Sequence, residues 1–255
     1  GKTTMFNNIT WEKQHVGNYA GVTVEKKEGH TDFNGRDLLF IDLPGTYSLT
    51  ARSLDELVAR NVIVNDNPDV IVNVLDASNL ERNLYLAAQL LELEKPMVIA
   101  LNMADVAEEM GIKYDFKKMA ELTGATIVST VGRTNIGTKE LLEATISVAA
   151  SQKAPGVTVN YGDLLEGKIA ELVAALEEAG TVTYPLRWIA IKLLENDPDV
   201  VEKVKGFANT EAVLQKAAAI REEIKDHVDL DIVFQEYRHR YAVEVYNQSL
   251  TQAPK

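Results

Sequence analysis

The sequence predicts an α/β fold, in which a doubly wound sheet with one antiparallel edge strand is followed by a small all-helical domain. Three observations lead to this prediction. Short apolar runs alternate with helical patterns in the first part of the chain, a strong hairpin signal stands near its start, and strand patterns stop at Thr138. The length of 255 residues suits one domain of ordinary size and a smaller appended one.

The start of the chain reads as a short helix, a loop and a hairpin. The helix is expected from Thr4 to about Thr10, and the polar stretch from Trp11 to Gly21 is expected to be a mobile loop. Asn34-Gly35 is the strongest short hairpin signal in the sequence. The strands beside it, Thr23 to Phe33 and Asp37 to Asp42, are therefore expected to pair antiparallel at a sheet edge.

Three later apolar runs have the length and composition of buried strands, and the segments between them have helical periodicity. Ser53 and Glu56 form a capping box, which indicates where the first of these helices begins. The expected strands are Val70 to Asp76, Met97 to Asn102 and Ala125 to Thr130, and the expected helices lie near 53–65, 81–94 and 115–123.

Only helical patterns follow Thr138. Ala154-Pro155-Gly156 is typical of a hinge, so we predict a sheet domain over residues 1–152 and a helical domain over 153–255. The expected helices lie near 138–151, 163–179, 185–196, 209–227 and 231–249.

The composition argues against several classes of function. The formal net charge of -12 repels phosphate backbones and no basic stripe offsets it, so no nucleic-acid partner is expected. The chain has no cysteine, which excludes disulfides and thiolate metal sites. No apolar run approaches the roughly 18 residues of a membrane helix, and no signal peptide opens the chain.

Gly1-Lys2-Thr3-Thr4 matches the end of the P-loop pattern G-x-x-x-x-G-K-S/T, and the front of that loop is expected upstream. In a P-loop, backbone N–H groups at a helix N-terminus hold phosphates, the lysine neutralises phosphate oxygens and the hydroxyl binds magnesium. These four residues are candidate phosphate ligands. Lys2 is also a candidate catalytic residue and Thr3 a candidate magnesium ligand, although Gly-Lys-Thr also occurs at ordinary surface turns.

Asp42-Leu43-Pro44-Gly45 follows the apolar strand that ends the hairpin. Ligands of open α/β sheets bind at the carboxyl edge of the strands, so Asp42 is a candidate magnesium and nucleotide ligand. The Gly45 amide is a candidate γ-phosphate contact with a catalytic role. A strand-end carboxylate that only caps a turn is the alternative.

Asn102-Met103-Ala104-Asp105 follows the next buried strand, and Val128-Ser129-Thr130 ends the one after it. An aspartate carboxylate accepts two hydrogen bonds from the guanine edge, whereas adenine presents an acceptor there and leaves the carboxylate unpaired. Asn102, Met103 and Asp105 are therefore candidate guanine ligands, and Val128, Ser129 and Thr130 are candidate backbone contacts on the other side of the base.

The order of these motifs resembles that of Ras-like P-loop GTPases. In that family a threonine after the first helix binds magnesium, and Thr23 in Gly21-Val22-Thr23 occupies its position. The resemblance implies that Gly21, Val22 and Thr23 contact the nucleotide and that Thr23 binds magnesium and takes part in catalysis; an ordinary strand residue is the alternative. Thr46 stands where Ras-like enzymes place the glutamine that orients water, so slow GTP hydrolysis is expected, driven by Lys2, magnesium and a monovalent cation.

Longer segments are similar to one family, the N-terminal cytoplasmic G domain, with its helical domain, of the bacterial ferrous-iron transport protein FeoB. Met103 replaces the lysine of the general N-K-x-D motif, as it does in FeoB, whereas Ala20 stands where the family often has proline. The segments are Val16 to Glu25, Asp42 to Leu49, Asp76 to Leu86, Ala100 to Asp105 and, less specifically, Arg187 to Leu194.

The FeoB resemblance implies a domain that binds GTP and GDP, hydrolyses GTP slowly and regulates ferrous-iron transport. It implies Mg²⁺ as a cofactor and also K⁺, through an asparagine of the P-loop upstream of Gly1. The implied location is the cytoplasmic face of the bacterial inner membrane, and the implied partner is the membrane-embedded part of the same transporter. Whether the chain forms a homo-oligomer is left open. Two alternatives are a ribosome-assembly or tRNA-modification GTPase, which the acidic balance disfavours, and a nucleotide-gated interaction module with negligible turnover.

Overall fold

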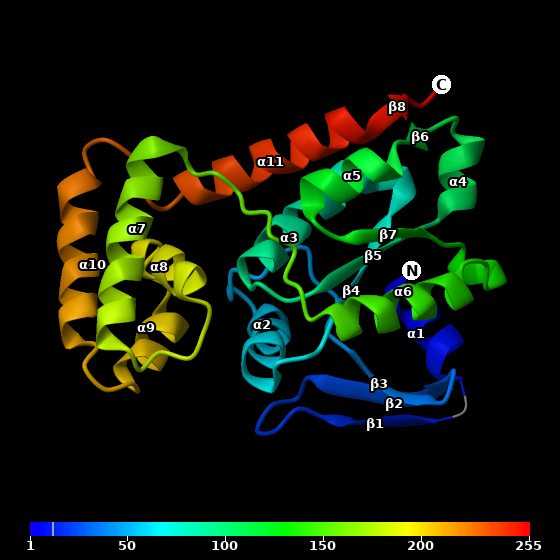
Figure 1. Ribbon diagram of the computed structural model, residues 1–255, viewed down its shortest axis with the longest axis horizontal. Coiled ribbons are helices and arrows are strands. Elements are labelled where there is room, and N and C mark those ends of the chain that lie inside the picture. Colours follow the sequence, from blue (N-terminus) through cyan, green and yellow to red (C-terminus); the bar gives the residue numbers. More distant parts are fainter. Residues whose placement is uncertain (12) are drawn as a thin grey trace. The chain divides into compact units, whose positions relative to one another are not determined.

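The computed structural model describes residues 1–11 and 13–255 and divides the chain into two compact units. One unit is Gly1–Val157 with Ala242–Lys255, and the other is Thr158–Tyr241 (Figure 1). The predicted domains were residues 1–152 and 153–255. The observed division differs chiefly at the C-terminus, where Ala242–Lys255 belongs to the first unit. The end of the chain groups with the first unit because β8 (Leu250–Gln252) pairs antiparallel with β6 (Lys113–Tyr114).

The core of the first unit is a parallel sheet in the order β4 (Ile71–Asp76), β5 (Met97–Asn102) and β7 (Thr126–Ser129). These are the three predicted buried strands. Val98 and Ala100 of β5 pack in one hydrophobic core, while Ile99 and Leu101 point to the opposite face and are also fully buried. Both faces of the sheet are therefore covered, which confirms the doubly wound architecture.

Helices of the first unit cover this sheet. Met5 and Leu141, from the first and the last of them, join the core on one face. The predicted helix start at Ser53 is confirmed, since the Ser53 hydroxyl accepts a hydrogen bond from the Glu56 N–H at 3.2 Å. The Glu56 carboxylate, which would complete the capping box on the Ser53 N–H, accepts instead from the Arg52 N–H at 2.9 Å. The helices are α1 (Lys2–Thr10), α2 (Leu54–Asp66), α3 (Leu80–Glu92), α4 (Ala104–Glu109), α5 (Phe116–Thr123) and α6 (Thr138–Ser151), of which α4 was not predicted.

A second sheet of this unit is antiparallel, in the order β1 (Gln14–Asn18), β2 (Glu25–Phe33) and β3 (Arg36–Asp42). The hairpin at Asn34-Gly35 is confirmed, because both residues have positive φ angles, 51° and 75°, as a two-residue turn between β2 and β3 requires. The fold class is thus confirmed, with the antiparallel strands forming a sheet of their own.

The prediction of a loop from Trp11 to Gly21 was wrong over β1, which pairs with β2 along its whole length. Within that range, Glu12 lies outside the described residues. All five residues of β1 are exposed, and no alternation of apolar and polar residues marked it as a strand. Backbone hydrogen bonds to β2 form it instead.

The second unit is helical, as predicted. Its elements are α7 (Gly162–Ala179), α8 (Leu186–Leu194), α9 (Pro198–Lys205), α10 (Glu211–Ile224) and the first part of α11 (Val233–Ser249). The short helix α9 was missed, although Asp197 caps it and Pro198 occupies its first turn. None of the helices in the described part of the chain is long and apolar enough to cross a membrane.

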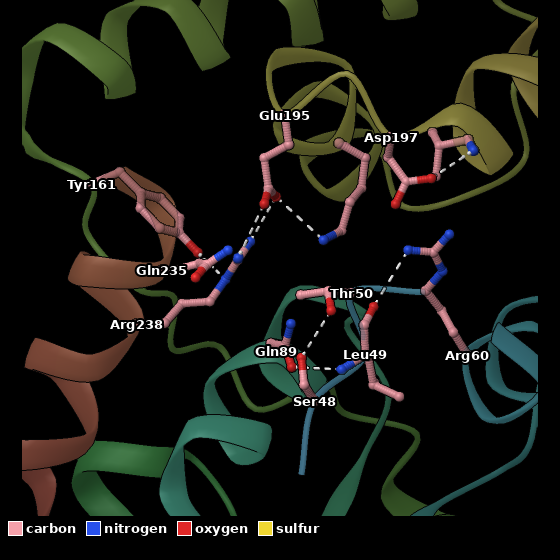
Figure 2. Close-up of polar contacts among 12 residues, drawn as sticks. Ser48, Leu49, Thr50, Arg60, Gln89, Tyr161, Glu195, Asp197, Gln235 and Arg238 are labelled. Atoms are coloured by element: carbon pink, nitrogen blue, oxygen red, sulfur yellow. Dashed lines mark hydrogen bonds and ion pairs between the residues drawn. The ribbon is translucent and has the colours of Figure 1, made fainter. Parts of the chain in front are cut away.

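Buried charges lie inside the helical unit (Figure 2). Arg238, which is fully buried, donates to Glu195 at 2.9 Å and to the Tyr161 hydroxyl at 3.1 Å, and Lys192 donates to Glu195 at 3.2 Å. Burial alone would raise the pKa of Glu195, but the charges and hydrogen bonds of Lys192 and Arg238 outweigh it and lower that pKa to about 2. The carboxylate therefore links α8 to α11 as a permanent anion.

We predict that Glu195→Gln lowers the free energy of unfolding by about 3–5 kcal/mol, because it removes the negative charge that two buried cations, Lys192 and Arg238, contact. Urea unfolding followed by the fluorescence of Trp188, a buried residue of this unit, measures the loss. Glu178→Gln, on an exposed face of α7, is the control and should change little. Equal stability of Glu195→Gln and the parent chain would contradict the role of this carboxylate.

The same carboxylate predicts a pH dependence. Its folded pKa lies below the ordinary value of 4.5, so its stabilisation is complete above pH 4.5 and disappears as the pH falls towards 2. Between these values the stability of the parent chain should fall more steeply than that of Glu195→Gln.

Candidate functional site

The parallel strands bring two of the predicted segments to one edge of the sheet. In the register of the sheet, Asp76 lies opposite Asn102, and Leu101 lies opposite Ser129. The segment Asn102 to Asp105 and the segment that follows β7 therefore leave the sheet side by side.

Asn102 connects these segments. Its side chain is 3% exposed, and its Oδ1 accepts hydrogen bonds from the Thr130 hydroxyl at 3.1 Å and from the Gly132 N–H at 2.9 Å. Its Nδ2 lies 3.6 Å from where a Cβ on Gly1 would stand. One buried amide thus joins the end of β5, the loop after β7 and the start of α1.

The next residues form the candidate base-recognition loop. Met103 has a left-handed backbone, with φ 57°, and a partly exposed side chain, and it places Asp105 in the first turn of α4. The Asp105 carboxylate accepts a hydrogen bond from Arg133 Nη2 at 2.5 Å. This hydrogen bond is the main cause that lowers the pKa of Asp105, so the group stays an anion at neutral pH.

Gly1, Lys2, Thr3 and Thr4 lie at the N-terminus of α1, where Gly1 is the N-cap residue. The Lys2 ammonium donates to the Asp42 carboxylate at the end of β3 and, at 2.6 Å, to the carbonyl of Leu43. The structure thus brings together two residues that the sequence assigned to the phosphates and to magnesium. The side chains of Thr3 and Thr4 are exposed on the first turn of α1.

The segment that follows Asp42 is held in place by hydrogen bonds at Leu49, beyond Gly45. Gly45 is exposed, and no atom lies within 4 Å of a Cβ built on it. Leu49, in contrast, is buried: its N–H donates to Gln89 Oε1 at 2.7 Å and its carbonyl accepts from Arg60 Nη1 at 3.3 Å (Figure 2). The loop from Leu43 to Ser48 therefore has two fixed ends, one at Asp42 and one at Leu49.

Gly21, Val22 and Thr23 lie in the turn between β1 and β2, where the N–H of Tyr19 donates to the carbonyl of Val24. Among the described residues, no hydrogen bond joins this turn to Lys2 or Asp42. Thr23 begins neither strand, and its assignment to the nucleotide stays a prediction.

The remaining candidates flank the base loop. The Val128 side chain is buried in the hydrophobic core, so only the backbone of Val128 could serve a ligand, and Ser129 is half-buried at the end of β7. Arg133 was missed by the sequence reasoning. The sequence offered one signal for Arg133, its position as a cationic residue in the loop that follows the last buried strand. Arg133 belongs to none of the motifs used above.

No group of three or more histidine, aspartate and glutamate side chains is arranged to hold a metal ion in the part of the chain that the structure describes. A divalent ion here would need ligand atoms from a bound molecule as well as from the protein.

Comparison with known families gives two matches. Residues 1–145 match the family model described as ferrous iron transport protein B, and residues 161–251 match that of the FeoB cytosolic helical domain. These matches confirm the resemblance seen in the motifs.

The curated relatives are longer than this chain. The chain is 41% identical over 216 residues to an Fe(2+) transport protein A/Fe(2+) transporter FeoB fusion protein of Porphyromonas gingivalis, covering 81% of the chain and 26% of that protein. It is 39% identical to a Staphylococcus aureus Fe(2+) transporter FeoB, covering 90% of the chain and 33% of the relative. The chain thus spans a third or less of the length of these relatives.

Solved structures resemble the whole chain. The GDP-bound form of a variant of the S. thermophilus FeoB G-domain matches with a TM-score of 0.90 and 32% identity, over 98% of this chain and 95% of that one. The cytosolic domain of the T. maritima FeoB iron transporter in its GMPPNP form matches with a TM-score of 0.84 and 29% identity, over the same shares.

We predict that Gln89→Leu frees the loop that ends at Leu49. The substitution leaves the buried Leu49 N–H without an acceptor, which costs about 1–3 kcal/mol. Hydrogen exchange of the Leu49 amide should become faster, while Gln248→Leu, an exposed change on α11, should leave it unaltered. Unchanged exchange in Gln89→Leu would show that Gln89 does not hold this end of the loop.

Proposed function

Since the chain belongs to the FeoB family of ferrous iron transport proteins, we propose that it binds GTP and GDP, hydrolyses GTP slowly and regulates ferrous-iron transport by its nucleotide state. The observation that carries the proposal is the Asn102 side chain, whose two hydrogen bonds hold the base loop beside the loop after β7. The GDP-bound and GMPPNP-bound forms of solved relatives support the choice of ligand.

Base recognition is assigned to Asp105. Its carboxylate is ionised and partly exposed at the carboxyl edge of the sheet, so it can accept from both the N1–H and the 2-amino group of guanine. Adenine offers an acceptor at that edge and would leave the carboxylate without a partner. Met103, which is 36% exposed, supplies an apolar side chain next to the base.

Lys2 is assigned to the phosphates. Its ammonium now contacts Asp42, and a bound triphosphate would offer it β- and γ-oxygens of higher charge. This contact neutralises charge on the phosphates, a contribution that acts when charge develops in the transition state. The Gly45 amide is exposed and free of neighbours that would prevent an approach to the γ-phosphate.

The donor atoms at this end fit magnesium. The Asp42 carboxylate, 8% exposed, already holds one cation, the Lys2 ammonium, and Thr3, the next residue of α1, is exposed and carries a hydroxyl. Magnesium prefers oxygen ligands and is usually held by one or two carboxylates together with substrate phosphates. When bound, it would supply charge neutralisation at the phosphates.

We propose that Thr23 joins this site through a movement of the turn between β1 and β2. The cost of that movement is small in apolar burial, because every residue of β1 is exposed. We propose that the nucleotide draws this turn and the Leu43 to Ser48 loop into order and that hydrolysis releases them.

The wider setting follows from the family. We propose a position at the cytoplasmic face of the bacterial inner membrane, with the membrane-embedded part of the same transporter as partner and a homo-oligomer as a possible assembly. Potassium dependence rests on the family resemblance alone, and no step is derived from it. No observation in the fold favours the ribosome-assembly or tRNA-modification alternative.

We predict that Asp105→Asn lowers the affinity for GDP by roughly tenfold or more and favours xanthosine nucleotides. The amide can donate to the xanthine oxygen, whereas one guanine donor loses its acceptor, at about 1–3 kcal/mol for each unpaired group. Titration of the intact protein with fluorescent GDP and xanthosine diphosphate measures both effects. Unchanged affinity for GDP would remove Asp105 from the base site.

We predict that Thr23→Ala separates binding from turnover. The P-loop residues and the base loop stay intact, so GDP affinity should change little, while GTP hydrolysis should fall by roughly 10-fold to 1,000-fold through loss of one preorganised contact. Single-turnover hydrolysis in saturating magnesium and potassium is the measurement. A wild-type rate in the variant would leave Thr23 as a turn residue only.

A further inference from the structure

Arg133 holds the carboxylate to which the base is assigned. It belongs to the short 3₁₀ turn Gly132–Thr134 after β7, and its Nη2 lies 2.5 Å from Oδ2 of Asp105. Asp105 lies in the first turn of α4, so this ion pair joins two elements that are distant in the sequence. An entering guanine needs the same carboxylate.

The backbone that carries Arg133 is fixed. The N–H of Gly132 donates to Asn102, and the carbonyl of Gly132 accepts from Asn8 at 2.6 Å. A Cβ on Gly132 would stand 3.1 Å from the sulfur of Met5, so the turn also packs closely on α1. The start of the Arg133 side chain is therefore held at a constant place beside the base loop.

The end of the side chain is free to move. The Arg133 side chain is 75% exposed, whereas that of Asp105 is 26% exposed. An ion pair with one long, solvated partner is weak, since water and salt screen it and the side chain loses rotamer freedom in the pair. It can therefore open when a better set of donors reaches Asp105.

We propose that Arg133 competes with guanine for Asp105 and so sets how tightly guanine nucleotides are held. This inference rests on the proposed function, in which Asp105 reads the base. Guanine brings two donors to the two carboxylate oxygens, while Arg133 occupies Oδ2. Binding of the base exchanges the arginine contact for the two base contacts, and departure of the base restores it.

The competition also gives Asp105 a partner when guanine is absent. A buried or half-buried carboxylate without a partner would be costly. With Arg133 beside it, the free site avoids this cost, and the affinity for guanine falls by the strength of the ion pair. Arg133 thus lowers the affinity of the site for guanine nucleotides and favours their release.

The test is a titration of the intact protein with fluorescent GDP in Arg133→Ala. At low salt the variant should bind GDP about two- to fivefold more tightly than the parent, the range that an exposed ion pair supports, and the gain should shrink at high salt. Arg36→Ala removes the same charge from an exposed position on β3 and should not tighten binding. Arg133→Lys, which keeps the charge, should lie between the parent and Arg133→Ala.

A double-mutant cycle separates this inference from the base assignment. In the Asp105→Asn background, with fluorescent xanthosine diphosphate as the probe, Arg133→Ala should change affinity by less than about 1.5-fold, because the neutral amide no longer attracts the guanidinium. Weaker or unchanged GDP binding by Arg133→Ala at low salt would overturn the competition. If Asp105→Asn itself leaves base preference unaltered, the base assignment has failed, and this inference fails with it.

Discussion

The candidate site depends on one buried amide oxygen, Oδ1 of Asn102. It accepts from the Thr130 hydroxyl and from the Gly132 N–H, and both donors lie in a protein interior where an unpaired polar group costs about 1–3 kcal/mol. Because Asn102 ends β5 and Gly132 follows β7, this oxygen fixes the distance between the two loops that surround the base position. The sheet provides the common edge from which both loops leave, and the hydrogen bonds of Asn102 fix the loops relative to each other.

The two ends of the site differ in how firmly they are built. The base end rests on β5, every residue of which is buried, and on Asn102. The phosphate end consists of the first turn of α1, the Lys2–Asp42 pair and the loop from Leu43 to Ser48, which hydrogen bonds hold at Leu43 and Leu49 and Arg82 contacts at Tyr47. Segments with few buried contacts open at low free energy, and β1, with five exposed residues, is one of them. A nucleotide switch needs a rigid base site beside phosphate contacts that can rearrange, and this division provides both.

How much of this the sequence predicts depends on the kind of signal each element leaves. The strand Met97–Asn102 was predicted at its observed bounds because all of its residues are buried. The turn at Asn34-Gly35 was predicted because its positive φ angles favour asparagine and glycine. β1 left no pattern, because hydrogen bonds to β2 alone form it. The short helix α4 follows Met103, an N-cap residue with a left-handed backbone, which no propensity favours.

The same reasoning explains the site. Asp42, Asn102 and Asp105 were predicted because each ends or follows a strand that the pattern reveals, and Lys2 because it matches the end of the P-loop pattern. The structure brings Lys2 to Asp42 and Asn102 to Thr130. Arg133 was not predicted, since its role comes from a contact across space to Asp105 and its exposed side chain resembles any surface cation. Thr23 was assigned by analogy, and its place in a turn depends on β1, which the sequence concealed.

The central claim, that guanine nucleotides bind at the carboxyl edge of the parallel sheet, is tested most directly by NMR of the backbone amides of the intact protein during titration with GDP and, separately, with ADP. The account predicts that GDP shifts the amides of Lys2, of Asn102 to Asp105 and of Ser129 to Gly132, and that ADP at the same concentration leaves the base-loop amides unmoved. Equal shifts with ADP, or GDP shifts confined to the helical unit, would contradict it.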